Sequence, residues 1–248
     1  MYKNVLIISD NKYLARKFFK IIERKKINCA FSLSISPFSN MKDFKIANGE
    51  EIQVVDLRDS RDINFIKKKY DLFLSIHCKQ IFPIDLITHV KCINIHPGYN
   101  PINRGWYPQI FAIINKLPIG ATIHEIDEKL DHGGIIDREY VTGNSFDTSE
   151  SLYNKIVQKE IELLDRNIEK IISGNYKITI PEDEGNLYLK KDFNGLLELD
   201  LLEQISVGDF IDRLRALTHG NYDNAYFKDP STGKKIFIRI ILKPEDEQ

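Results

Sequence analysis

Short apolar runs alternate with amphipathic segments along the first part of the chain, and few folds are compatible with that pattern. The first run spans residues 4–9 and ends at Asp10-Asn11, after which apolar residues recur every three or four positions, as in a helix. Further strand-like runs lie at 29–35, 52–56, 72–76 and 92–96, with helical segments near 60–70 and 83–89. Strands that are apolar on both faces and alternate with helices form mostly parallel sheets. We therefore predict an α/β fold with a Rossmann-like, mostly parallel sheet and helices on both faces.

The second part of the chain has a different pattern. A capping box at 147–150 predicts the start of one long amphipathic helix that ends near Gly174. The remaining segments are short, and two strands around a turn are expected near 224–227 and 235–242. We therefore predict a catalytic domain at 1–176 and a small C-terminal subdomain at 177–248, which contains a β-hairpin and serves substrate binding or dimerisation.

The charges nearly balance, because 35 Lys and Arg face 36 Asp and Glu and leave a formal net charge of −1. A dedicated nucleic-acid binder needs a basic surface, so we predict no nucleic-acid partner. No apolar run approaches the roughly 20 residues of a membrane-spanning helix, so we predict no signal peptide and no membrane partner. Three cysteines without metal-binding spacing, Cys29, Cys78 and Cys92, are typical of a reduced, cytoplasmic protein.

Asn94 and His96 stand at the end of a predicted buried strand, and Asp131 follows in the motif Leu130-Asp131-His132-Gly133-Gly134. Residues two positions apart lie on one face of a strand, so the amide and the imidazole project together. This pair suits a reaction in which negative charge develops on a carbonyl oxygen, because Asn donates a hydrogen bond and His can move a proton. Asp131 can orient the imidazole, stabilise its protonated form or carry a proton away.

Three ordered motifs resemble those of the folate-dependent formyltransferases. They are Asn94-x-His96-Pro97, then Gly120-Ala121-Thr122-Ile123-His124, then Leu130-Asp131-x-Gly133-Gly134-Ile135-Ile136. The resemblance implies that Asn94, His96 and Asp131 are catalytic and that 10-formyltetrahydrofolate is the formyl donor. It also implies a folate pocket between the loops at 76–81 and 126–130, with the candidate residues Ile76, His77, Cys78, Lys79, Ile126, Asp127 and Leu130.

Two further segments, 97–108 and 213–227, are similar to those of nucleotide-sugar N-formyltransferases that act on dTDP-linked aminodideoxy sugars for bacterial surface polysaccharide. The resemblance implies transfer of a formyl group to a sugar amine, with dTDP-4-amino-4,6-dideoxyglucose as the first expectation. Whether the 3- or the 4-amine reacts stays open, as does the glycan that receives the product.

Residue chemistry suggests where the nucleotide part of such a substrate binds. Aromatic rings stack on a thymine and amides read its edge, while cations and free amides suit a pyrophosphate. The candidates are Trp106, Tyr107, Tyr222 and Asn224 for the base, and Lys12, Lys79, Arg104 and Arg213 for the pyrophosphate. Ser9, Asn11 and Lys12 form a turn after the first strand that suits either phosphate contact or plain helix capping. Core packing or a solvated surface remains the alternative role for each of these residues.

The expected mechanism follows from the three catalytic candidates. His96 accepts a proton from the attacking amine, and Asn94 stabilises the oxygen that gains negative charge, together with the protonated imidazole. No metal ion or covalent enzyme intermediate is needed. The other histidines are expected to be structural; they are His77, His89, His124, His132 and His219.

Three other functions share part of this chemistry. A methionyl-tRNA formyltransferase would need a surface complementary to a polyanion, which the net charge and the acidic end at 245–247 do not favour. A deformylase would use water in place of the amine, and a noncatalytic ligand-binding module would keep only the fold. The apolar strand at 235–242 presents an edge that often pairs with another chain, so we predict a homodimer.

Overall fold

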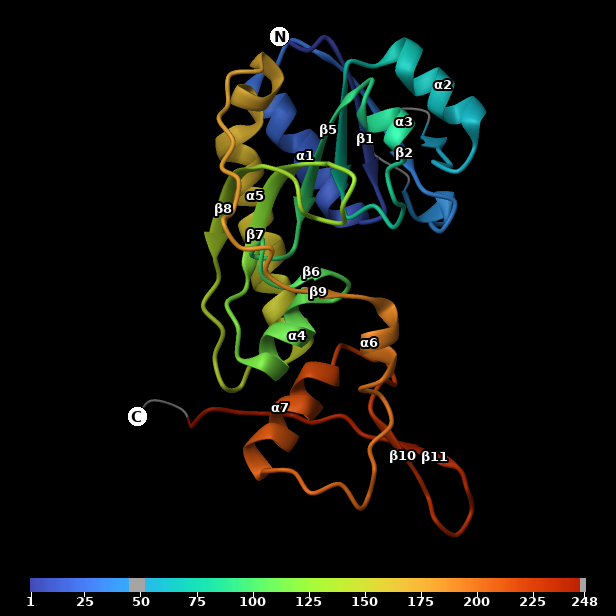
Figure 1. Cartoon of the computed structure of the whole chain (residues 1–248), viewed down its shortest axis with the longest axis vertical. Helices are drawn as coiled ribbons and strands as arrows, with labels where there is room; N and C mark the ends of the chain where they lie inside the picture. The colour runs from blue at the N-terminus through green and yellow to red at the C-terminus, as the bar shows by residue number, and fades with distance from the viewer. Residues whose placement is uncertain (45–51, 246–248) are drawn as a thin grey trace.

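The computed structural model describes residues 1–44 and 52–245. Its centre is a seven-stranded sheet with the order β3-β2-β1-β4-β5-β7-β8. These strands are β1 (Asn4–Ser9), β2 (Ala30–Ile35), β3 (Gln53–Val54), β4 (Leu72–Ile76), β5 (Lys91–His96), β7 (Gly120–Glu125) and β8 (Ile135–Tyr140). Neighbours among β1 to β5 are parallel, whereas β7 is antiparallel to β5 and to β8. The predicted α/β fold with a mostly parallel sheet is confirmed (Figure 1).

Helices cover both faces of this sheet. They are α1 (Lys12–Lys25), α2 (Ser60–Lys69), α3 (Ile84–Ile87) and α5 (Ser149–Ser173). The same part of the chain also contains a 3₁₀ helix, η1 (Met41–Phe44), and the helix α4 (Pro108–Asn115). Val5 and Ile7 of β1 pack in the hydrophobic cluster that includes α1 and α5. Leu6 and Ile8 pack in the cluster that includes α2 and α3. This two-sided burial explains why residues 5–8 of β1 are all apolar, rather than apolar at alternate positions only.

Helix α5 begins one residue later than the predicted capping box implies. Thr148 is the N-cap, and its hydroxyl accepts a bond from the Ser151 amide while the Ser151 hydroxyl accepts one from the Thr148 amide. Ser151 rather than Glu150 completes the box, because the reciprocal residue stands three positions after the cap. Asp147 instead accepts bonds from the Asn144 amide and from Nζ of Lys155.

After α5 the chain returns beside β8, at the edge of the sheet, and forms a smaller C-terminal part (Figure 1). Its elements are β9 (Leu187–Tyr188), which pairs with β6 (Arg104–Gly105), then α6 (Lys190–Asn194), α7 (Val207–Leu217), β10 (Tyr226–Lys228) and β11 (Lys235–Phe237). Leu214 and Leu217 of α7 belong to the same hydrophobic cluster as α1 and α5, so the core continues into this part. The division at residue 176 stays a prediction.

The predicted hairpin forms, but its strands are shorter than the expected 224–227 and 235–242. The Ile238 amide still donates to the Ala225 carbonyl, at 2.8 Å. The preceding residue, Asn224, is held at the end of α7, where its Nδ2 donates to the Leu217 carbonyl. Beyond this point the Ile240 amide donates to Oγ1 of Thr218, at 3.2 Å, rather than to the opposite strand, and the ladder ends.

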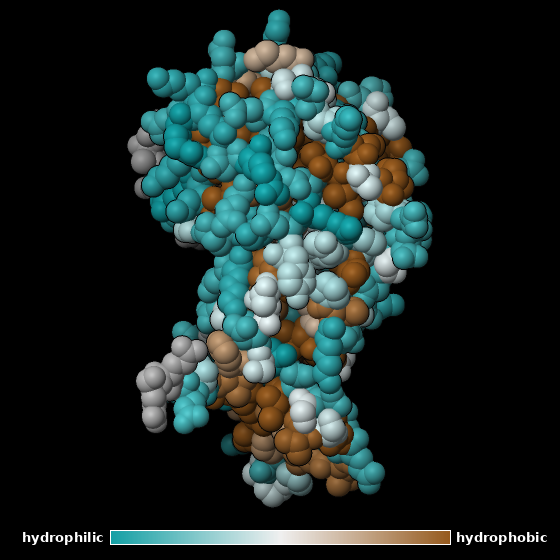
Figure 2. All heavy atoms as spheres, turned by 90° about the vertical axis from the view of Figure 1, so that its left-hand side faces the viewer, coloured by the Kyte–Doolittle hydropathy of each residue, from teal (hydrophilic) through white to brown (hydrophobic). Residues whose placement is uncertain are grey.

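Exposed apolar side chains gather on the C-terminal part, where Figure 2 shows hydrophobic atoms over much of the lower surface. Leu202 is 87% exposed, Val207 76% and Ile241 84%. Contiguous exposed apolar surface is typical of an interface. Within residues 1–44 and 52–245, no helix is both long enough and apolar enough to span a bilayer.

Candidate active site

Asn94, His96 and Asp131 are brought together at one end of the sheet. Asn94 and His96 project from β5, and Asp131 lies in the loop between β7 and β8. Nδ2 of Asn94 donates to Oδ1 of Asp131 at 3.0 Å, and Nδ1 of His96 lies 3.5 Å from Oδ2 of the same carboxylate. The expected convergence of an amide, an imidazole and a carboxylate is therefore present in the geometry, while their catalytic roles remain predictions.

The backbone of Asp131 has the left-handed conformation, with φ at +48°. That conformation costs free energy for a residue other than glycine, so it persists only where the surroundings enforce it. The Gly105 amide donates to Oδ2 of Asp131 at 3.1 Å, and Nδ2 of Asn100 donates to its carbonyl oxygen at 2.8 Å. Arg104 Nη1 donates to the neighbouring Leu130 carbonyl at 3.3 Å. The segment at 100–105 thus holds the carboxylate toward β5.

Burial separates the charge states of the two ionisable groups. It lowers the pKa of His96 to about 4, although the nearby Asp131 carboxylate opposes that shift. Burial by itself raises the pKa of Asp131, but His96, His124 and the Gly105 amide outweigh it and lower that pKa well below its usual value. At neutral pH the site therefore holds a neutral imidazole beside an ionised carboxylate, which is the state a proton acceptor needs.

His124 is a member of this cluster that the sequence reasoning treated as structural. It stands opposite Asn94 in the β5–β7 ladder, and its Nε2 lies 3.3 Å from Nδ2 of Asn94. Its Nδ1 lies 2.7 Å from the Glu125 carbonyl, which can only accept, so Nδ1 donates there; in that tautomer Nε2, which also lies 3.6 Å from Oδ1 of Asp131, accepts from Asn94. Both amide hydrogens of Asn94 are thereby used, and the longer bond, to His124, is the one that a substrate oxygen can replace. Its place in the motif at 120–124 was the available indication.

Several buried polar atoms around Asp131 have no partner among the described residues. They include Nε2 of His96, Oδ1 of Asn100 and Nε of Arg104, all within the segment at 96–104. Buried polar groups are nearly always paired, so such a cluster marks a place where a ligand or water completes the bonding. These residues fit a polar ligand that is bound between β5 and the segment at 100–105.

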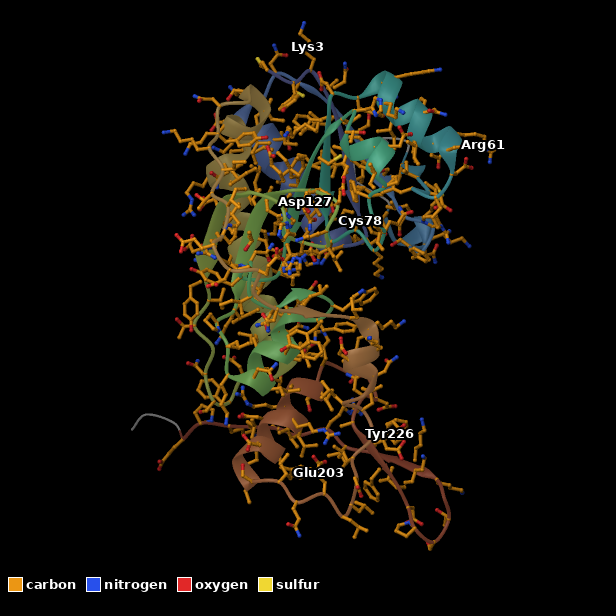
Figure 3. All side chains as sticks on the ribbon, in the orientation of Figure 1. Lys3, Arg61, Cys78, Asp127, Glu203 and Tyr226 are labelled. Atoms are coloured by element: carbon orange, nitrogen blue, oxygen red, sulfur yellow. The ribbon has the colours of Figure 1, made fainter. Side chains whose placement is uncertain are left out.

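The candidate folate residues lie on two loops at the same end of the sheet, where Figure 3 labels Cys78 and Asp127. Lys79 is exposed, and its amide donates to Asp10. Burial raises the pKa of the Cys78 thiol to about 12, so this thiol is not a nucleophile at neutral pH.

On the second loop, Asp127 contacts Nδ1 of His132 at 2.6 Å. Ile76 is buried at the end of β4, Ile126 is half-buried beside β5, and Leu130 is half-buried before Asp131. Nε2 of His77 lies 2.8 Å from a carboxylate oxygen of Glu160.

The candidate nucleotide residues fall into two groups. Trp106 and Tyr107 follow the segment that holds Asp131, their rings 5.5 Å apart, and Tyr107 also packs 4.4 Å from Phe193. Tyr222 is 68% exposed, and the centroid of its ring lies 6.0 Å from that of the His219 ring. Arg104 lies at the catalytic cluster, as described above.

Two of these candidates are occupied within the C-terminal part. Arg213 donates to the Leu196 and Glu198 carbonyls and pairs with Glu203, which Figure 3 labels far from Asp127. Asn224 caps α7, as described above. The structure therefore does not bring Arg213 to the catalytic cluster, and it gives the Asn224 amide a structural bond.

The turn after β1 has the geometry of a helix cap. Oδ1 of Asn11 accepts bonds from the Tyr13 and Leu14 amides. The Ser9 hydroxyl contacts the Asn11 backbone, and Lys12 is the first residue of α1. The capping alternative is thus present, while phosphate contact by these residues stays a prediction.

Comparison with known proteins gives consistent similarities. Residues 41–168 match the family model described as formyl transferase, and residues 192–244 match the N-formyltransferase dimerization C-terminal domain. The chain is 51% identical over 180 residues to the dTDP-4-amino-4,6-dideoxyglucose formyltransferase of Mycobacterium tuberculosis H37Rv, covering 73% of this chain and 76% of that protein. A methionyl-tRNA formyltransferase of Lachnospira eligens is 28% identical over 160 residues, which cover 62% of this chain and 50% of that protein.

Solved structures show the same relationship over nearly the whole chain. The structure of a 4-N formyltransferase from Francisella tularensis superposes with a TM-score of 0.92 at 41% identity, covering 98% of this chain and 99% of that one. A sugar N-formyltransferase from a Shewanella species gives a TM-score of 0.93 at 36% identity, with the same coverage of both chains.

Proposed function

This chain belongs to the formyl transferase family, and we propose that it transfers the formyl group of 10-formyltetrahydrofolate to the 4-amino group of dTDP-4-amino-4,6-dideoxyglucose. The broader class, a folate-dependent enzyme that formylates a sugar amine, is supported by full-length likeness to sugar N-formyltransferases. The observation that carries the proposal is the contact of Asn94 and His96 with one ionised carboxylate, Asp131. The mycobacterial relative's name supports the 4-amine.

In the proposed reaction, the bound folate supplies an electrophilic formyl carbon to the incoming amine. The amine must be neutral to attack, and it loses a proton as the new bond forms. His96 accepts that proton at Nε2, because its Nδ1 faces Asp131 and carries the hydrogen directed at the carboxylate. The ionised Asp131 stabilises the imidazolium that results. When the tetrahedral adduct collapses, the bond between the formyl carbon and N10 of the folate breaks, and the imidazolium returns the proton to that nitrogen, so that tetrahydrofolate and the formamido sugar leave and His96 is again neutral.

Asn94 has the second role. One of its amide hydrogens stays on Asp131 and fixes the orientation of the side chain. The other moves from His124 to the carbonyl oxygen that gains negative charge, so the interaction strengthens as the reaction proceeds. Loss of one such donor typically lowers turnover by about 10²- to 10³-fold.

For the acceptor, we propose that Trp106, Tyr107 and Tyr222 contact the thymine and that Arg104 contacts the pyrophosphate. The buried guanidinium supports this role for Arg104, because its Nε has no partner among the described residues and its nearest carboxylate, Glu184, is 3.6 Å away and mostly exposed. Anions bind strongly to such preorganised, dehydrated donors.

The test is a formylation assay with purified protein and 10-formyltetrahydrofolate, read by mass spectrometry and by release of tetrahydrofolate. Separate reactions contain dTDP-4-amino-4,6-dideoxyglucose, its 3-amino counterpart, methionyl-tRNA, or no acceptor. We expect a formamido sugar only with the 4-amino substrate. Formylation of the 3-amine would correct the position, and tetrahydrofolate release without an acceptor would indicate a deformylase. Formyl-methionyl-tRNA as the main product, or no turnover at all, would overturn the proposal.

A further inference from the structure

Glu160 is a buried acid that the proposed mechanism does not use. It projects from the middle of α5, and its side chain has no exposed surface. Its two carboxylate oxygens lie 2.8 and 2.9 Å from Nε2 of His77. Burial raises the pKa of Glu160, while contact with His77 opposes that rise. A buried carboxylate is costly unless it is paired, so the contact with His77 is the condition under which Glu160 is tolerated.

The chain of contacts continues on the other side of His77. Nδ1 of His77 lies 3.1 Å from the Tyr153 hydroxyl, and that hydroxyl lies 3.1 Å from Nδ2 of Asn11. Tyr153 and Glu160 both belong to α5, whereas Asn11 follows β1 and His77 follows β4. We call Glu160, His77, Tyr153 and Asn11 the Glu160 relay.

The hydrogens of the Glu160 relay can be placed from its fixed end. Oδ1 of Asn11 accepts from the Tyr13 and Leu14 amides, so Nδ2 must face Tyr153 and donate to it. The Tyr153 hydroxyl then donates its own hydrogen to Nδ1 of His77. With Nδ1 accepting from Tyr153, Nε2 of His77 carries the hydrogen that faces the Glu160 carboxyl group. One direction of hydrogen bonding satisfies every member.

The Glu160 relay ends on two loops that border the catalytic cluster. β1 and β4 are neighbours in the sheet, and their loops are also joined by the bond from the Asp10 amide to the His77 carbonyl, at 3.3 Å. The Lys79 amide donates to the Asp10 carboxylate at 2.8 Å. His77 itself has the left-handed conformation, with φ at +55°, which costs free energy and requires support from its surroundings. The bonds from Glu160 and Tyr153 to its ring supply that support.

We propose that Glu160 and Tyr153 are positioning residues, which act through His77 and Asn11 to hold the loops after β4 and β1 in the conformation that receives the formyl donor. The proposal rests on the proposed function in one respect, the assignment of the loop at 76–81 to the folate. The other part of the proposal, that side chains of α5 hold these two loops in place, depends only on the contacts within the Glu160 relay.

The first experiment measures loop order without any ligand, by hydrogen exchange of Glu160→Leu, Glu160→Gln and the wild type. We expect the amides of Asp10 and Lys79 to exchange at least about tenfold faster in Glu160→Leu, because His77 loses its acceptor. Glu160→Gln keeps an acceptor oxygen and should change these amides less. The matched control is Asn167→Leu, which removes another buried bond from α5, to Asp137 on β8, on the side away from both loops. Unchanged protection in Glu160→Leu, or equal loss in the control, would overturn the proposal.

The second experiment separates binding from turnover in Glu160→Gln and Tyr153→Phe. We expect the KM for 10-formyltetrahydrofolate to rise about tenfold while the KM for the sugar nucleotide stays within about twofold, since the residues that we propose for the acceptor, Trp106, Tyr107, Tyr222 and Arg104, lie on other segments. A purely structural role would lower the unfolding temperature of both variants and leave the two KM values unchanged, as in Asn167→Leu. If the wild type formylates no amino sugar, the proposed function fails, and the exchange experiment still decides whether the Glu160 relay holds the loops.

Discussion

A Cβ atom built on Gly98 would lie 2.4 Å from Nε2 of His96, and Oδ2 of Asp131 lies 3.5 Å from the opposite nitrogen of the ring. The imidazole is therefore confined between the backbone that follows β5 and the carboxylate that faces it. Both His96 and Asp131 are nearly inaccessible to water, so the ring cannot relieve a clash by turning outward. At the scale of single residues, the site depends on the absence of one side chain as much as on the presence of three.

We predict that Gly98→Ala lowers kcat by about 100-fold, because a displacement of the ring by about 1 Å is enough for a loss of that size. The new methyl group must push Nε2 of His96 out of line, while the fold is kept. The measurement is the steady-state rate at saturating substrates, with circular dichroism as a check on folding. Gly143→Ala is the control, since a Cβ there would meet only Leu152, at 3.6 Å. A Gly98→Ala enzyme with wild-type kcat would show that the ring has room to adjust.

The pH dependence of stability provides a second test at this scale. His96 has its pKa lowered from 6.5 to about 4, so between these values the unfolded chain binds a proton that the folded chain does not. Folding stability must then fall as the pH drops, by about 1.5 kcal/mol for this residue between pH 6.5 and 5. Chemical denaturation of the wild type and of His96→Gln at both pH values measures the difference. An identical pH dependence in the two proteins would show that His96 is not held neutral.

At the scale of elements, the sequence was informative wherever burial alone decides the structure. The apolar runs at 4–9 and 72–76 coincide with β1 and β4, because both faces of these strands are covered and successive positions, Val5 to Ile8 and Leu72 to Leu74, are buried and apolar. It was less informative where a side chain chooses between neighbours. Ser151 rather than Glu150 completes the capping box of α5. The second hairpin strand ends at Phe237, and Asn224, which was expected in the first strand, instead binds the end of α7.

The candidate site shows the same division between local and long-range information. Strand periodicity placed Asn94 and His96 on one face, and the resemblance to folate-dependent formyltransferases added Asp131. The bond between Glu160 and His77 was not predictable, because it joins residues 83 positions apart and depends on how α5 lies across the sheet. The bonds of Arg213 were not predictable for a similar reason, since its partners, the Leu196 and Glu198 carbonyls, carry no sequence pattern; its contact with a pyrophosphate stays a prediction.

We predict that the N-cap of α5 contributes measurably to the stability of the fold. Thr148→Ala removes the hydroxyl that accepts from the Ser151 amide and leaves that amide without its cap. We expect the free energy of unfolding to fall by about 1 kcal/mol, the usual cost of losing such a cap, with kcat unchanged. Urea denaturation measures the effect, and Thr142→Ala, at an exposed position before the helix, is the control. Equal stability of the two variants would mean that the capping box contributes nothing measurable.

At the scale of the whole molecule, one hydrophobic cluster runs from the sheet through α5 into α7, so the C-terminal part is attached through a shared core. The same part exposes several large apolar side chains, and residues 192–244 match a dimerization domain. The C-terminal part buries Leu217 completely and leaves Leu202, which precedes α7, 87% exposed, so it has one face for the protein's own core and another for a partner. We therefore propose a homodimer formed through the C-terminal parts.

We predict that the protein is a dimer at micromolar concentration and that Leu202→Asp with Val207→Asp converts it to a monomer. Two buried charges that lack partners cannot be accommodated in an interface, whereas both positions are solvated in the separate chain, at 87% and 76% exposure. Gel filtration with light scattering gives the mass of each form. The control is Phe65→Asp, an exposed apolar position on α2, at the opposite part of the molecule, which should leave the dimer intact. A monomeric wild type would remove the prediction, and a dimer that survives the double substitution would place the interface elsewhere.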